Sequence, residues 1–208
     1  MTLLEQLQAA AENARKGLPA ALTIDAAGVQ YTRNFMPQER LILLGGGTIA
    51  QPLCRYAADL GFELVVADDR PSFANHSRFP EAKQIVCDLF PAAIEKIGIR
   101  ESDYVAVITR GHRYDADCLR ELLRGIMPRY LGMIGSKKRT VGLLNMLEEE
   151  GFSRADLDRI HTPIGLDIGA LTVKEIAISI VAELIAERRR TTDRRSKSSI
   201  LTAEDIDL

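Results

Sequence analysis

The chain has 208 residues, of which 46% are hydrophobic and 27% are charged, and its formal net charge is -2. This balance is typical of a globular protein with one sizeable core, and it gives no support for nucleic acid or an anionic membrane as a partner. No apolar run approaches the ~20 residues of a membrane-spanning helix. Glu5 and Glu12 lie where a signal peptide would be uncharged, so we expect a cytoplasmic protein.

Three cysteines, Cys54, Cys87 and Cys118, lie far apart and none belongs to a CxxC pair. This pattern indicates neither a disulfide framework nor a structural zinc site. We therefore expect each cysteine to be a small buried hydrophobic side chain, and we expect no metal site.

Residues 1–39 are expected to form an appendage. Thr2 to Lys16 reads as an amphipathic helix that opens with a capping box between Thr2 and Glu5. The segments 20–25 and 30–35 flank a short turn and predict a hairpin.

Strand and helix patterns alternate over residues 40–190. The predicted strands are LILLGG, FELVVAD, QIVCD, DYVAVIT and RYLGMIG, and helical patterns cover residues 48–60, 116–124, 136–150, 153–158 and 172–187. Such alternation predicts an α/β fold, a Rossmann-like doubly wound parallel sheet with helices on both faces. Residues 191–208 then form a polar tail, which we expect to be solvated.

The segment Gly45-Gly46-Gly47-Thr48-Ile49-Ala50 fits GxGxxA between a predicted strand and a predicted helix. Its glycines allow a tight turn and a close approach of a pyrophosphate to the helix N-terminus. Asp68 and Asp69 end the next strand, where a carboxylate accepts hydrogen bonds from a ribose. The neighbouring Arg70 could accommodate the 2′-phosphate of NADP, so the sequence does not decide between NAD and NADP. The alternative is a tight turn with no ligand.

A second candidate loop follows the strand DYVAVIT and contains Arg110, Gly111, His112, Arg113, Tyr114 and Asp115. Two cations, an imidazole and a carboxylate suit an anionic ligand and a proton-transfer group, so His112 and Asp115 are candidate catalytic residues. The alternative is that Asp115 caps the next helix and that the rest is solvated loop.

The third candidate loop is Gly135-Ser136-Lys137-Lys138-Arg139, at the start of a predicted helix. Cations in a first helical turn oppose the helix dipole, and a bound anion would relieve that repulsion. The alternative is that these cations are simply solvated.

The apolar turn at residues 163–170 is a further candidate. We expect it to close either over the sheet edge or over a ligand, and in the second case Asp167 would contact the ligand.

Five motifs follow one another over roughly residues 36–190: LILLGGGTIAQPL, VVADDRPSFANHSRFP, VITRGHRYDADCL, YLGMIGSKKRT and IHTPIGLDIGALT. In this order they resemble the XdhC/CoxI family, the accessory proteins of xanthine dehydrogenase and carbon monoxide dehydrogenase. The resemblance implies the following crevice residues: Gly45, Gly47, Asp68, Arg70, Arg110, Gly111, His112, Asp115, Gly135, Ser136 and Lys137.

The resemblance also implies a maturation role. Family members are understood to bind the molybdenum cofactor (molybdopterin), protect it during sulfuration and deliver it to the apo-enzyme of a molybdenum hydroxylase. A cysteine desulfurase is then an expected further partner. Members resemble two-domain chains, whereas only about 40 residues precede Leu41 here. We expect that a separate chain supplies the N-terminal domain or that its task is dispensed with.

Two other functions stay open on the residues alone. One is an NAD(P)-dependent oxidoreductase that uses His112 as acid or base, and the other is a nucleotide-sensing regulatory module. The cofactor is therefore molybdopterin or NAD(P). The apolar faces of residues 172–187 and 2–16 also predict a homodimer.

Overall fold

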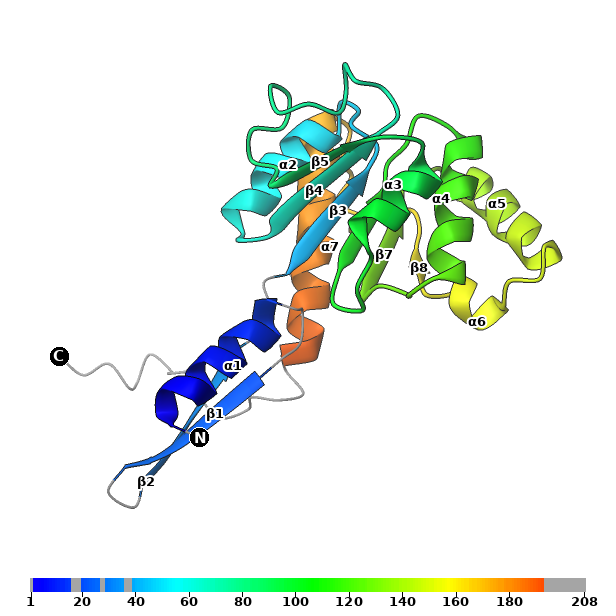
Figure 1. The fold of residues 1–208 in the computed structure, drawn as a ribbon. Helices are drawn as coiled ribbons and strands as arrows, with labels where there is room; N and C mark the ends of the chain where they lie inside the picture. Colours follow the sequence, from blue (N-terminus) through cyan, green and yellow to red (C-terminus); the bar gives the residue numbers. More distant parts are fainter. Residues whose placement is uncertain (1, 16–19, 27–28, 36–38, 193–208) are drawn as a thin grey trace.

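The computed structural model describes residues 2–15, 20–26, 29–35 and 39–192. Within them, six parallel strands form one sheet in the order β5-β4-β3-β6-β7-β8 (Figure 1). The strands are β3 (Arg40–Leu44), β4 (Glu63–Asp68), β5 (Gln84–Cys87), β6 (Tyr104–Val107), β7 (Tyr130–Met133) and β8 (Ile160–His161). This is the doubly wound order, which reverses between β3 and β6.

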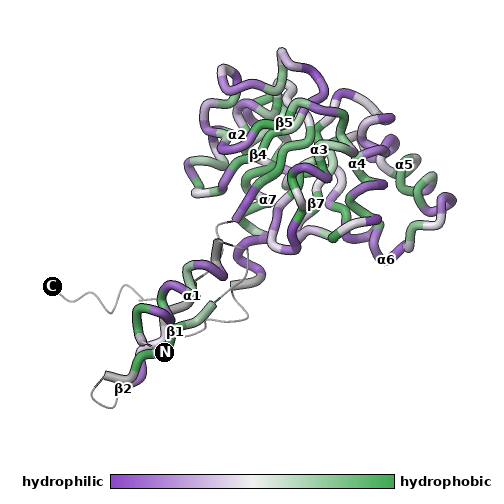
Figure 2. Tube along the Cα trace, in the orientation of Figure 1, coloured by the Kyte–Doolittle hydropathy of each residue, from purple (hydrophilic) through white to green (hydrophobic). Residues whose placement is uncertain are grey.

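Helices cover both faces of this sheet. The helices α2 (Ala50–Asp59) and α7 (Val173–Thr192) pack with Leu41 and Leu43 on one face. The other face carries α3 (Phe90–Ile97), α4 (His112–Arg124), α5 (Lys137–Glu149) and α6 (Arg154–Leu157). Hydrophobic residues gather on the central strands (Figure 2). The predicted Rossmann-like fold class is confirmed.

Continuous apolar sequences form these strands because both sides of the sheet are covered. In β3, Leu41 and Leu43 enter the core on the α2 and α7 side, while Ile42 and Leu44 enter the core on the other side. All five residues of β3 are buried. A strand with one solvated face would instead alternate apolar and polar residues.

Several predicted boundaries were wrong. Helix α2 begins two residues later than predicted, at Ala50, and α4 begins four residues earlier, at His112. Helix α7 runs on to Thr192, so the start of the predicted polar tail is helical. The rest of that tail, from residue 193, lies outside the described residues. Helix α3 and strand β8 were not predicted.

The expectation for the cysteines holds for Cys54 and Cys118, which are buried, and is wrong for Cys87, which is exposed at the end of β5. Within the described residues, no three histidine, cysteine or acidic side chains gather into a metal-binding group. No described helix combines the length and the apolar character that crossing a membrane requires.

The N-terminal appendage contains the predicted helix and hairpin. Helix α1 (Leu3–Arg15) lies on the antiparallel strands β1 (Ala20–Ala26) and β2 (Val29–Phe35), and the three project away from the sheet (Figure 1). The predicted capping box is present. The amide of Thr2 donates to Glu5 at 2.7 Å, and the amide of Glu5 donates to the Thr2 hydroxyl at 3.3 Å.

The apolar face of α7 is part of the core. Ala177, Ile180 and Leu184 are fully buried, and the helix packs against α2. This face is therefore not the free hydrophobic surface on which the homodimer prediction was based. The homodimer itself stays a prediction.

One buried ion pair joins the sheet to the α3 side. Arg40 donates to both carboxylate oxygens of Asp103, at 2.9 and 2.6 Å, and also to the Gly98 carbonyl at the end of α3. Both side chains of the pair are almost completely buried. Removing one partner would leave an uncompensated charge in the core.

We expect Asp103→Ala to lower the free energy of unfolding by about 3–5 kcal/mol, because Arg40 would keep its charge without a partner. Urea unfolding at pH 7 measures this loss. The matched control is Asp158→Ala, whose carboxylate pairs with Arg154 on the surface and should matter little. Equal, small losses in both variants would contradict the structural role assigned to Asp103.

Candidate cofactor-binding crevice

The glycine turn lies at the carboxyl edge of the sheet, where the strand order reverses. Gly45 follows β3 with a φ of 117°, and its amide donates to the Ala67 carbonyl in β4 at 2.8 Å. A Cβ on Gly45 would lie 2.5 Å from the carbonyl oxygen of Ile108, just after β6. Only glycine therefore fits between the ends of β3 and β6.

The other two glycines have different surroundings. A Cβ on Gly46 would lie 2.6 Å from the Phe73 carbonyl oxygen, whereas a Cβ on Gly47 would meet nothing within 4 Å. Ala50, the last motif residue, is fully buried. The fold thus requires the first two glycines, while Gly47 borders open space.

Backbone amides at the start of α2 lack acceptors. Among the described residues, none accepts a hydrogen bond from the amides of residues 47–49, and no side chain caps the helix at Ile49. Unpaired amides at a helix N-terminus bind anions, because the helix dipole adds to their partial positive charge. Thr48, one of the predicted site residues, belongs to this group, and its contact with a ligand stays a prediction.

Asp68 has a role that was not predicted from the sequence. Its Oδ2 accepts from the Gly46 amide at 2.8 Å and from Arg70 Nη2 at 2.9 Å. Its Oδ1 accepts from the Arg70 amide at 3.1 Å and from Arg70 Nε at 2.8 Å. These donors use the acceptor sites of a carboxylate. A ribose hydroxyl could bind here only if Arg70 moved away.

The surroundings of Asp68 favour its charged form. Burial by itself would raise the pKa, but hydrogen bonds from the Arg70 guanidinium and from the Gly46 and Arg70 amides outweigh it and lower the pKa of Asp68. The carboxylate therefore holds the glycine turn as an anion.

A second ion pair joins the chain after β4 to the chain after β6. Arg110, after β6, donates to both oxygens of Asp69, each at 2.9 Å, and also to the Tyr114 hydroxyl at 2.6 Å. The structure thus brings together two predicted residues, Asp69 and Arg110, that are 41 positions apart. Tyr114 had no predicted role of its own, although it holds Arg110 in place.

Two further residues border the glycine turn and were missed. The Arg70 guanidinium lies 3.5 Å from the centre of the Phe73 ring, and the Arg78 guanidinium lies 4.8 Å from it. Arg78 also donates to the Gly46 carbonyl at 3.3 Å. Phe73 and Arg78 both belong to the segment FANHSRFP. The sequence signal that could have identified them is the presence of aromatic and basic residues soon after a strand that ends in two aspartates.

The loop after β6 differs from the expectation for Asp115. Gly111 is the N-cap of α4, and Asp115 lies buried in the first turn, where it accepts from the Thr109 hydroxyl at 2.5 Å. The alternative interpretation of Asp115 as the helix cap was therefore wrong. His112 is the first residue of α4, and its side chain lies outside the described part of the chain.

The third loop is also at the carboxyl edge. Ser136 is the N-cap of α5, after Gly135, without a hydrogen bond from its own side chain to the helix. Lys137 and Lys138 are exposed, as a solvated or anion-binding turn requires. In the apolar turn at residues 163–170, Ile164 is buried beside β7, and the amide of Leu166 donates to the Ser179 carbonyl in α7 at 3.1 Å, so the turn closes over this edge of the sheet as expected. Asp167 is exposed.

We expect Asp68→Asn to lower the free energy of unfolding at pH 7 by about 1.5–3 kcal/mol, because the charged hydrogen bonds to Arg70 are lost. The pKa of Asp68 is lower in the folded chain than in the unfolded chain, so its contribution is present above the unfolded pKa of about 3.9 and disappears as the pH falls through the folded pKa. The free energy of unfolding, measured in urea at pH 7 and at pH 3, should therefore fall less between these two pH values in the variant than in the wild type. A loss equal to that of the wild type would contradict this assignment.

Comparison with known proteins places these features in a family. The XdhC Rossmann domain family matches residues 41–184. A probable xanthine dehydrogenase subunit of Bacillus subtilis (strain 168) is 32% identical over 160 residues, which are 77% of this chain and 46% of that protein. The molybdenum cofactor insertion chaperone PaoD of Escherichia coli (strain K12) is 27% identical over 156 residues, 74% of this chain and 42% of PaoD.

A solved structure agrees with these matches. A crystal structure of a xanthine dehydrogenase from Bacillus halodurans superposes with a TM-score of 0.69 at 36% identity and covers 88% of this chain and 51% of that chain. The chain spans less than half the length of the two curated relatives. The fold, the glycine turn and the family match agree, and the chain belongs to the XdhC family through its Rossmann domain.

Proposed function

We propose that the chain is an accessory protein for a molybdenum hydroxylase of the xanthine dehydrogenase type, and that it binds the molybdenum cofactor or a nucleotide form of it at the glycine turn. The names of the relatives support the accessory role, since one is a molybdenum cofactor insertion chaperone and another belongs to a probable xanthine dehydrogenase. The observation that carries the binding site is the set of unpaired amides at residues 47–49 beside open space at Gly47.

The chemistry of this turn fits the phosphate of molybdopterin. Amides at a helix N-terminus donate to phosphate oxygens, and Gly47 leaves room for the group to approach the backbone. Arg70 and Arg110 add positive charge at the same edge, although each is already paired with an aspartate. Lys137, at the start of α5, offers a further cation for the remaining negative charge of the ligand, and the cofactor contact predicted for Lys138 stays a prediction.

Each group has a distinct task in this proposal. Asp68 fixes the Gly46 amide, so the next amides stay aimed at the crevice. The Asp69 and Arg110 pair closes the crevice between the ends of β4 and β6. The bound cofactor supplies the molybdenum centre that the receiving hydroxylase uses. His112 and Asp115 stay predicted candidates for proton transfer.

An NAD(P)-dependent oxidoreductase is less well supported. Recognition of a ribose usually needs a free carboxylate at the end of the second strand, and the carboxylate of Asp68 is occupied by Gly46 and Arg70. A ligand held mainly through a phosphate suits this turn better. Delivery of sulfur by a cysteine desulfurase, a separate chain with the N-terminal domain, a homodimer and a nucleotide-sensing role stay predictions.

We expect Gly47→Val to weaken molybdopterin binding by roughly tenfold or more, because its branched side chain would occupy the space that the phosphate needs. The variant should fold, since a Cβ at this position meets no atom within 4 Å. Anaerobic titration with molybdopterin released from a molybdoenzyme measures the affinity, with NAD and NADP titrated in parallel.

The control variant is Gly47→Ala, which places only one methyl group in the same space and should bind better than the valine variant. Wild-type affinity in a folded Gly47→Val variant would remove the glycine turn from the site. Turnover of NAD or NADP without pterin binding would replace the proposed function with that of an oxidoreductase.

A further inference from the structure

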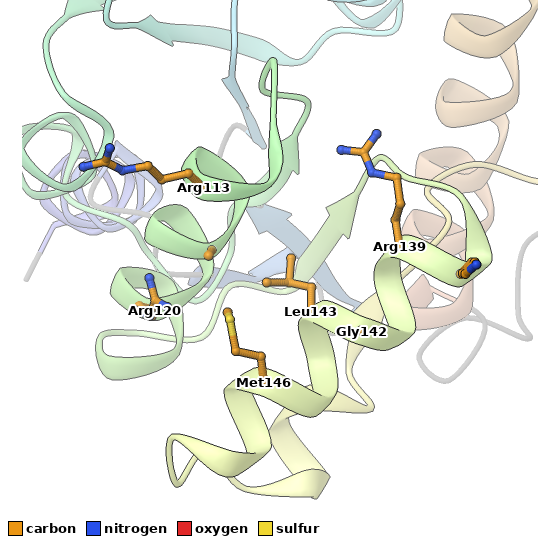
Figure 3. Close-up of a pocket in the computed structure, with 8 residues that line it drawn as sticks. Arg113, Arg120, Arg139, Gly142, Leu143 and Met146 are labelled. Carbon is orange, nitrogen blue, oxygen red and sulfur yellow. The ribbon is translucent and has the colours of Figure 1, made fainter.

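A groove of about 550 Å³ lies between α4 and α5, and none of its lining residues belongs to the glycine turn. Ala116, Leu143 and Met146 give it an apolar floor. Figure 3 shows Leu143 and Met146 extending from α5 toward α4, while Arg113 and Arg139 come from the first turns of the two helices. The groove therefore combines hydrophobic contact area with a positively charged rim.

Gly142 keeps this groove open. It lies within α5, where glycine is among the least favourable residues for helix stability. A Cβ at Gly142 would meet nothing within 4 Å, so packing inside the described chain does not require a glycine there. Gly142 also lines the groove, and a larger side chain would project into it. A binding partner that approaches the helix backbone would explain this residue.

The charges of the rim define what the groove can bind. Arg120 is already paired, at 2.7 Å with Glu150 and at 3.0 Å with Asp117. Arg113 and Lys138 are exposed, and neither has an ion-pair partner among the described residues. A complementary ligand therefore carries apolar groups for the floor and carboxylates for Arg113 and Lys138.

The chain itself contains a segment of this chemistry. Residues 200–208 read ILTAEDIDL, with Ile200, Leu201, Ile206 and Leu208 interspersed with Glu204, Asp205 and Asp207. The segment lies outside the described residues and follows the end of α7 at Thr192. We propose that residues 200–208 bind in the groove between α4 and α5, with the apolar side chains on Leu143 and Met146 and the carboxylates near Arg113 and Lys138.

A fluorescent, C-terminally amidated peptide of residues 198–208 tests this proposal by anisotropy. The receiving protein is the full chain with Glu204→Gln, Asp205→Asn and Asp207→Asn, whose own segment has lost its charge and should leave the groove accessible. We expect saturable binding that weakens as salt screens the carboxylates. Introducing Gly142→Leu into this protein should weaken binding roughly tenfold or more, because leucine fills the groove.

The matched control is Gly142→Ala, which also removes the helix glycine but adds only one methyl group, and which should keep most of the affinity. Both variants should fold, since alanine and leucine favour helix more than glycine does. Gly47→Val should leave peptide affinity unchanged, which separates this groove from the crevice. No binding to the charge-neutralised chain, equal affinity for the leucine and alanine variants, or equal binding of a peptide without its three carboxylates would overturn the proposal.

Discussion

The carboxylate of Asp68 sets the geometry on which the candidate site depends. It is buried at the end of β4, where it binds the Gly46 amide and the Arg70 guanidinium at the same time. The first contact ties the glycine turn to the neighbouring strand. The second places Arg70 on the face of the Phe73 ring. Since Gly45 also packs closely against Ile108, the turn is held from both sides.

Much of the fold could be predicted because its physical cause is local. Strands covered on both faces require continuous apolar runs, and the glycine turn occupies the junction between the first such strand and a helix. Helix α3 was missed because the apolar run Phe90–Ile97 is short and has Pro91 in its first turn. Strand β8 has two residues, too few for any periodicity. Its position is set by pairing with β7.

The residues of the site were predictable in position but not in role. The sequence placed Asp68 and Asp69 at the end of a strand, and it could not show that Arg70 and Arg110 would take their carboxylates. Such pairings depend on how separate strand ends meet in the folded chain. The buried contact between Thr109 and Asp115 is a similar case, because the start of α4 depends on Gly111 as its cap.

The structure contains two positively charged regions of different character. One is the crevice, where cations are neutralised by Asp68 and Asp69 and the backbone amides are the remaining donors. The other is the groove between α4 and α5, where an apolar floor accompanies the charge. A phosphate suits the first and an acidic, partly apolar segment suits the second.

In the proposed site, the backbone of the glycine turn binds the phosphate of the cofactor. Nuclear magnetic resonance of the isotope-labelled chain, titrated anaerobically with molybdopterin, tests it most directly, because a hydrogen bond to phosphate moves the resonance of the amide that donates it. We expect saturable shifts for the amides of residues 47–49. Unchanged resonances there, with saturable shifts confined to the first turn of α5, would contradict the claim.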